Sequence, residues 1–174
     1  RHMVETAVHA AKLTRRVARP DLLLFAALFH DIGKGTQEDH SVRGVRLIEP
    51  IARRIGFDAQ EIEILKNLVL HHLLLSSTAT RRDLDDPATI QSIVAVIPDV
   101  NTLELLHALS IADGEATGSA GWSDWKAALV NDLVQRVKRA MAGAEVAQQP
   151  EVSKEQRAAA EKGPLRVTLA GHSS

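Results

Sequence analysis

Apolar residues recur at helical spacing along most of this chain, and the segments that they mark predict an all-α protein of about six to seven helices. Polar capping residues and prolines set the expected boundaries. The expected helices cover residues 2 to about 18, 21–31, 37–56, 58–75, 86–98, 99–116 and 123–143. Residues 76–86 are rich in Ser, Thr, Arg and Asp, so we expect a polar loop there.

Individual residues mark several of these boundaries. Pro20 is expected to stop the first helix, and Asp21 to cap the second. Asp58 and Glu61 have capping-box spacing, and Asp99 and Ser123 precede later helices as N-caps. Pro50 is expected to kink or restart the third helix, and Pro87 fits the first turn of a helix that ends at Pro98.

Composition indicates what the core is made of. The chain has 174 residues, of which 45% are hydrophobic but only 3% are aromatic, with no tyrosine. Leu, Ile, Val and Ala must therefore fill the core, which favours interdigitated helices over a sandwich of sheets. The length suits one ordinary hydrophobic core better than two.

Charge and cysteine content exclude several classes of partner and site. The formal net charge is −1, so bulk electrostatics gives no reason to expect a nucleic-acid or membrane partner. The absence of cysteine excludes disulfides and thiolate metal sites. No apolar run approaches the roughly 18 to 20 residues that a spanning helix needs. We therefore expect a cytoplasmic protein in which any metal ligand is a histidine or a carboxylate.

The two ends suggest a piece of a longer polypeptide. The chain begins at Arg1 with a helical pattern already under way and without an initiator methionine. We expect one folded domain over residues 1–142 and a linker over 143–174, where Ala, Gln, Glu, Lys and Pro become frequent. Residues 165–169 alternate like the first strand of a further domain.

One apolar segment ends in an unusual way. Residues 22–29 are almost entirely apolar, yet they lead directly into His30 and Asp31, followed by Gly33, Lys34 and Gly35. Hydrophobic packing does not require that ending. His30 can be a hydrogen-bonded core histidine beside a loop aspartate, or the two side chains can converge on one cation at the end of the helix.

Further histidines and carboxylates fall on otherwise apolar helices. Each costs about 1–3 kcal/mol if it is buried without a partner. A single such residue is usually a satisfied core residue, whereas a shared divalent cation would satisfy several together. Nitrogen and oxygen donors suit Mn or Mg, with Fe or catalytic Zn as alternatives. The residues concerned are His2, His30, Asp31, His40, His71, His72 and Asp113.

The order of these residues resembles the H…HD…D signature of the HD superfamily of metal-dependent phosphohydrolases, which are all-helical. The resemblance implies a first metal held by His2, His30, Asp31 and Asp113. It also implies that Asp31 can bridge to a second metal. The additional ligands of that metal would be His40, His71 and His72, although adjacent helical residues point about 100° apart. Lys34 would neutralise a phosphate oxygen, so Lys34 and Asp31 are the predicted catalytic residues.

Longer segments narrow the resemblance. HDIGKGTQEDHS, LVLHHLLLSSTATRRDLDDP, ALSIADGEATG and WSDWKAALVNDLV closely resemble the HD domain of bacterial bifunctional uridylyltransferase/uridylyl-removing enzymes. The likeness covers residues 1 to about 142. In that family a nucleotidyltransferase domain precedes the HD domain and two ACT domains follow it, and the substrate is the nitrogen-regulatory protein PII. Some relatives attach adenylyl rather than uridylyl groups, and this segment does not distinguish the two.

The implied reaction is metal-dependent hydrolysis of the phosphodiester between a nucleotide and a tyrosine of PII. A bound cation lowers the pKa of water and offsets charge on the phosphoryl oxygens. Two alternatives are hydrolysis of a small nucleotide and a catalytically silent module that relays glutamine sensing. Arg81 and Arg82 are candidate phosphate or partner contacts. Their alternative role is in salt bridges with neighbouring acids of the same loop, namely Asp83, Asp85 and Asp86.

Overall fold

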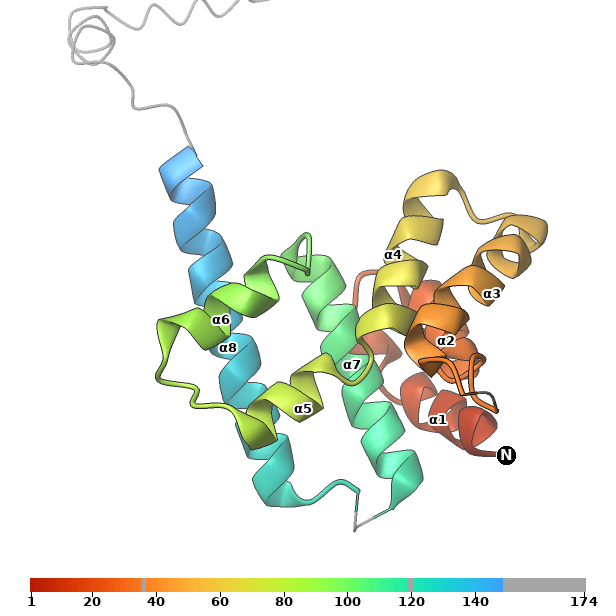
Figure 1. The fold of residues 1–174 in the computed structure, drawn as a ribbon, viewed down its shortest axis with the longest axis horizontal. Helices are drawn as coiled ribbons and strands as arrows, with labels where there is room; N and C mark the ends of the chain where they lie inside the picture. Colours follow the sequence, from red (N-terminus) through yellow and green to blue (C-terminus); the bar gives the residue numbers. More distant parts are fainter. Residues whose placement is uncertain (36, 119–120, 149–174) are drawn as a thin grey trace, which may run out of the picture.

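A computed structural model describes residues 1–35, 37–118 and 121–148, and this part of the chain forms eight α-helices and one 3-10 turn (Figure 1). The elements are α1 (His2–Ala11), η1 (Thr14–Arg16), α2 (Pro20–Phe29), α3 (His40–Ile55), α4 (Ala59–His71), α5 (Leu74–Arg81), α6 (Pro87–Val94), α7 (Val100–Thr117) and α8 (Asp124–Gln148). The predicted all-α class is therefore confirmed. The predicted segment 165–169, and the predicted linker beyond residue 148, lie outside the described residues.

Helix α7 is the central element. It contacts α1, α2, α4, α5 and α8. In Figure 1, α1 to α4 lie on one side of α7, whereas α5, α6 and α8 lie on the other. Within these two groups, α3 packs on α4, and both α5 and α6 pack on α8. None of the described helices is both long and apolar enough to cross a membrane.

The core consists mainly of aliphatic side chains, as the composition predicts. The largest fully buried side chains are all Leu or Ile. Leu22 and Leu23 of α2 are fully buried, as are Leu65 and Leu68 of α4. Leu28 of α2 is 39% exposed, but the buried residues of this helix anchor the apolar segment before His30 in the core. The end of α2 is thereby held in place.

Most predicted helix starts are confirmed. Asp58 and Glu61 form the complete capping box at the start of α4. Asp86 accepts a hydrogen bond from a backbone N–H at the start of α6, and Asp99 does the same at the start of α7. The Ser123 hydroxyl caps α8 by accepting from a backbone N–H at 3.3 Å. Local capping chemistry thus sets these boundaries.

Two boundaries near the N-terminus differ from the prediction. Helix α1 ends at Ala11 rather than near residue 18, because the Thr14 hydroxyl donates to the Ala11 carbonyl and a 3-10 turn follows. Helix α2 begins at Pro20, which occupies its first turn. Asp21 does not cap it, because its carboxylate pairs with the guanidinium of Arg19.

The predicted polar loop over 76–86 is partly wrong, since α5 covers residues 74–81. Leu75, Thr78 and Ala79 form a buried stripe at helical spacing, and this packing outweighs the modest helix propensity of the Ser and Thr residues. Helix α5 accounts for the additional helix. Helix α3 begins at His40 and continues through Pro50 without a restart.

Three predicted helix ends are also wrong. Helix α4 ends at His71 rather than at residue 75. Helix α6 ends at Val94, four residues before Pro98. Helix α8 continues to Gln148, beyond its predicted end at residue 143, and the predicted division into a domain and a linker stays a prediction. Alanines and a glutamate follow Gly143, and such residues favour helix continuation.

The turn after α2 packs closely against the start of α3. A methyl group on Gly33 would collide with the carbonyl oxygen of His40 and would lie 2.8 Å from the backbone nitrogen of Gly44. Gly44 in turn faces Val69 of α4. Only glycine at position 33 permits this approach, which fixes where His40 begins α3.

Replacing Gly33 with alanine is therefore expected to destabilise the domain by about 3 kcal/mol, because a backbone carbonyl stands where the new methyl group must go. Urea unfolding would measure the loss. Gly143→Ala is the matched control: apart from the adjacent residues and the helix's own backbone, no atom of the described residues lies within 4 Å of a methyl group there, and the change should stabilise α8 by about 0.5–1 kcal/mol. Equal stability of the Gly33→Ala and wild-type chains would contradict the close packing.

Candidate metal centre

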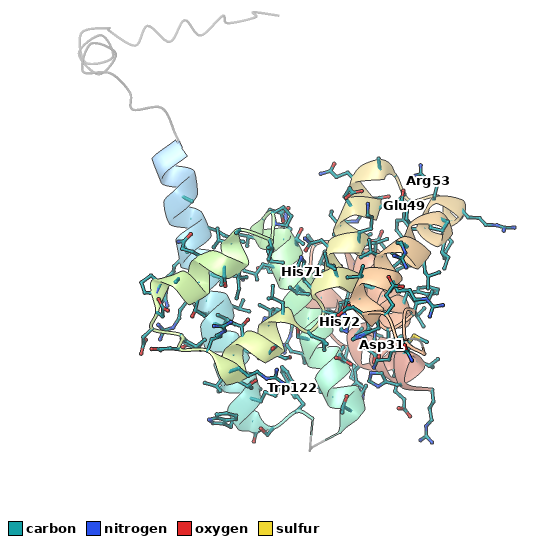
Figure 2. The ribbon with its side chains drawn as sticks, viewed as in Figure 1. Asp31, Glu49, Arg53, His71, His72 and Trp122 are labelled. Carbon is teal, nitrogen blue, oxygen red and sulfur yellow. The ribbon has the colours of Figure 1, made fainter. Side chains whose placement is uncertain are left out.

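Five helices bring histidines and aspartates together at one place. His2 begins α1, and His40 begins α3. His30 and Asp31 follow α2 directly, and His72 ends α4 as its C-cap. Figure 2 shows Asp31 and His72 where α2, α3 and α4 meet. Asp113, near the end of α7, completes the cluster.

The first part of the cluster contains His2, His30, Asp31 and Asp113. The Nε2 atom of His2 lies 2.8 Å from Oδ1 of Asp113 and 3.7 Å from Oδ2 of Asp31. Nε2 of His30 lies 3.3 Å from the same two oxygens. The structure thus brings together all four residues predicted for a first metal.

The second part of the cluster contains Asp31, His40 and His72. Oδ1 of Asp31 lies 3.8 Å from Nε2 of His40 and 3.6 Å from Nε2 of His72. The two Nε2 atoms are 3.3 Å apart. The donor atoms of these three residues lie within 4.8 Å of one another, as do those of His2, His30 and Asp31.

Asp31 belongs to both groups. Its Oδ2 faces His2 and His30, whereas its Oδ1 faces His40 and His72. One carboxylate can therefore offer an oxygen to each of two neighbouring cations. This is the arrangement expected of a bridging ligand.

Backbone carbonyl groups orient two of the rings in the same way. Nδ1 of His30 lies 3.0 Å from the carbonyl oxygen of Ala27, and Nδ1 of His72 lies 2.8 Å from that of Val69. Both carbonyls belong to the last turn of a helix, where they have no intrahelical partner. If Nδ1–H donates to the carbonyl, the Nε2 lone pair faces the cluster, as a metal ligand requires. In each case the carbonyl belongs to the residue three positions before the histidine, at the end of a helix. This spacing is the only feature of the sequence that indicates the contact.

Two buried atoms of the cluster have no hydrogen-bond partner among the described residues. They are Nε2 of His30 and Oδ1 of Asp31. His30 is fully buried, and Asp31 is nearly so. Such atoms are costly to bury alone, but both are good ligands for a divalent cation. The residues therefore fit a metal centre of nitrogen and oxygen donors.

The pKa values reflect the attraction between the rings and the carboxylates. Burial disfavours charge on His30, but Asp113 and Asp31 outweigh it and raise the pKa of His30 to about 9. Burial also disfavours charge on the two carboxylates, yet His30 and its neighbours hold the pKa of Asp31 and of Asp113 below the usual range. Burial lowers the pKa of His72. Without a cation, a proton on His30 therefore balances the carboxylates.

Lys34 lies at the mouth of the cluster. Its Nζ is 2.5 Å from Oδ2 of Asp31, while 60% of its side chain is exposed. The ammonium group thus touches the shared carboxylate and faces solvent at the same time. This position agrees with the predicted contact to a phosphate oxygen, which remains a prediction.

The structure does not bring His71 into the cluster. Helical geometry turns it about 100° from His72, so that it lines a separate cavity formed with α5 and α6. In Figure 2, His72 lies between His71 and Asp31. The predicted ligand trio of His40, His71 and His72 is therefore reduced to His40 and His72, with Asp31 as the third donor.

Arg81 and Arg82 line the same cavity as His71. Their alternative role in salt bridges within the loop is not found among the described residues, because the neighbouring acids have other partners. Asp85 pairs with Arg136 at 2.8 Å, and Asp86 caps α6. The two guanidinium groups are exposed and form no ion pair in the described part of the chain.

The separation of the neighbouring histidines predicts different metal contents for two variants. If each group holds one ion, His72→Gln should lower the content from about two ions per chain to about one, because it removes a donor from the second group. His71→Gln should retain both ions. Elemental analysis after reconstitution with Mn²⁺ would measure this. Equal losses in the two variants would contradict the assignment of His72 rather than His71.

Comparison with known proteins gives a consistent family assignment. A model of the HD domain family matches residues 1–115. A bifunctional uridylyltransferase/uridylyl-removing enzyme of Streptomyces coelicolor is 59% identical over 143 residues, which cover 82% of this chain and 17% of the relative. Enzymes with the same name from Mycobacterium tuberculosis and Ectopseudomonas mendocina are 58% and 40% identical over 82% and 76% of the chain.

These matches confirm the resemblance to the HD domain of the bifunctional enzymes. The chain spans less than a fifth of the length of these relatives, 18% of the Mycobacterium tuberculosis enzyme and 15% of the Ectopseudomonas mendocina enzyme. The matched residues include the whole cluster from His2 to Asp113.

Proposed function

Because this chain belongs to the HD domain family, we propose that its histidine and aspartate cluster is the metal centre of a phosphodiesterase that removes uridylyl groups from the protein PII. The observation that carries the proposal is the position of Asp31, which offers one buried oxygen to each of two ligand groups. The relatives named uridylyl-removing enzymes support the reaction, and the sequence resemblance supports PII as the substrate. The expected location is the cytoplasm.

Within this proposal, a divalent cation held by these residues, Mn²⁺ or Mg²⁺ with Fe or Zn as alternatives, would lower the pKa of water and offset the charge of the phosphoryl oxygens. His2, His30, Asp31 and Asp113 would hold one ion. Asp31, His40 and His72 would hold another. The carbonyl groups of Ala27 and Val69 keep the His30 and His72 rings in the orientation that binding requires.

Lys34 has a different role in the proposal. Its exposed ammonium group binds a non-bridging oxygen of the substrate phosphate while it remains close to Asp31. This contact orients the phosphodiester at the mouth of the site and stabilises negative charge that develops on it. The transferase activity and glutamine sensing would belong to neighbouring nucleotidyltransferase and ACT domains, as the resemblance implies.

Incubation of the chain with uridylylated PII tests the proposal. With Mn²⁺ we expect release of UMP and unmodified PII, and with excess EDTA we expect neither. Adenylylated PII is the parallel substrate that distinguishes the two nucleotides. If the chain hydrolyses only free nucleotides and not modified PII, its substrate is a small nucleotide rather than PII. A folded chain that binds no Mn²⁺, Mg²⁺, Fe or Zn after reconstitution would favour the silent, signal-relaying module.

A further inference from the structure

A second polar cavity lies on the other side of the α4 end from the metal centre. It has a volume of about 630 Å³ and is formed by the end of α4, by α5 and by the start of α6. His71 lines this cavity, while His72 faces the metal centre. Two adjacent residues of one helix end thus serve two separate sites. The proposed hydrolysis makes no use of the second one.

The cavity carries uncompensated positive charge. Arg81 and Arg82 both line it, and neither forms an ion pair within the described residues. The one acid on the wall is Asp86, and one of its oxygens accepts the N–H of Ala88 at 2.9 Å. The positive charge of the two guanidinium groups therefore exceeds the negative charge of the one carboxylate, which favours an anionic ligand. Guanidinium binds phosphate oxygens in pairs, which gives the site geometric selectivity.

Hydroxyl groups add further donors to the wall. Thr78 and Thr89 line the cavity, and each is only 9% exposed. The described residues show no side-chain hydrogen bond from either hydroxyl, and neither oxygen is among their fully buried polar atoms without a partner. Both hydroxyl groups are therefore open to the cavity, where they can donate to the acceptor oxygens of a ligand. A phosphate or a ribose provides such oxygens.

Leucines form an apolar part of the same wall. Leu70 and Leu73 are 40% and 46% exposed, and both line the cavity. A flat apolar ring placed against them would remove this surface from water. The cavity thus joins an apolar surface to a cationic one, and its volume is in the range of small-molecule sites.

From this combination we infer that the α4–α5–α6 cavity binds a nucleoside monophosphate, with its phosphate on Arg81 and Arg82 and its base against Leu70 and Leu73. The site is distinct from the metal centre and requires no cation. A nucleotide bound there would touch His71, the neighbour of a proposed metal ligand. The inference concerns binding alone and does not depend on the proposed hydrolysis.

Calorimetric titration of the chain in EDTA tests this site without any contribution from the metal centre. UMP and AMP are expected to bind, inorganic phosphate to bind more weakly, and uridine not to bind detectably. The Arg81→Gln/Arg82→Gln variant should bind UMP at least about tenfold more weakly, because it removes two charge-assisted contacts. Arg15→Gln/Arg54→Gln is the matched control, since both of these arginines are exposed and lie outside the cavity. It should retain wild-type affinity.

A second variant covers the case in which the double variant does not fold. Ser77 is a residue of the cavity wall, and Ser77→Asp would place a carboxylate opposite the phosphate. We expect at least about a tenfold loss of UMP affinity, because like charges repel at close range. Absence of UMP binding to the wild-type chain would overturn the inference, as would unchanged affinity in the folded Arg81/Arg82 or Ser77 variants. Either result would leave metal-dependent hydrolysis to be judged by its own assay.

Discussion

Replacement of Asp31 with asparagine is expected to abolish metal binding and to lower hydrolysis at least about 1,000-fold, because a bound cation contributes several kcal/mol to stabilisation of the transition state. Asn retains the shape of the side chain but removes the charge that both ligand groups share. A change at this one residue should therefore prevent metal binding at both ligand groups. Elemental analysis and the UMP-release assay measure the two effects.

Asp124→Asn serves as the matched control for this variant. Asp124 is an exposed acid in the first turn of α8, outside the cluster. It should retain the wild-type metal content and rate. Circular dichroism should show native helix content for both variants, because Leu and Ile side chains form the core. Wild-type hydrolysis by a folded Asp31→Asn chain would refute the proposed centre.

In EDTA, the free energy of unfolding is expected to fall by up to about 3 kcal/mol between pH 6.5 and 9, because folded His30 keeps its proton over this range. The unfolded chain releases that proton near pH 6.5, whereas the folded chain releases it near pH 9. The stabilisation is therefore complete below pH 6.5 and is lost as the pH rises through 9. Urea unfolding at intervals of half a pH unit would measure the slope.

The other shifted groups of the cluster act outside this range. Asp31 and Asp113 have lowered pKa values, so their stabilising effect disappears only in acid. The lowered pKa of His72 also acts below pH 6.5. His30→Gln should therefore abolish the decrease in the free energy of unfolding between pH 6.5 and 9. It should leave the loss of stability in acid unchanged. A slope that is the same in both chains would show that His30 is not the group responsible.

A divalent cation should oppose this loss of stability. The cation requires neutral His30, so its affinity should rise over the same range in which the proton leaves. With saturating Mn²⁺, stability between pH 6.5 and 9 should remain level or increase. The His30 ring thus carries a proton in the metal-free chain and would bind the cation in the metal-loaded chain.

Several elements were predictable because their causes are local. The capping box of Asp58 and Glu61 acts within one turn, and so does the cap at Asp99. The polar ending of an apolar segment, at His30 and Asp31, likewise marks the centre of the site by residue type alone. By contrast, α5 was not predicted from the sequence. Its stability comes from side chains such as Leu75 packed in the core rather than from the helix propensity of its residues.

The all-α class, the aliphatic core and the chemical nature of the site follow from the amino-acid sequence alone, because these depend on residue type and on spacing along one helix. Which donor atoms meet, by contrast, depends on how the helices pack in three dimensions. The tertiary structure joined His2 to Asp113 across 111 positions, and it directed one oxygen of Asp31 to each ligand group. It also separated His71 from His72, because α4 packs on α2, α3 and α7, so that His72 at its end faces the ligand groups while His71 faces the cavity formed with α5 and α6.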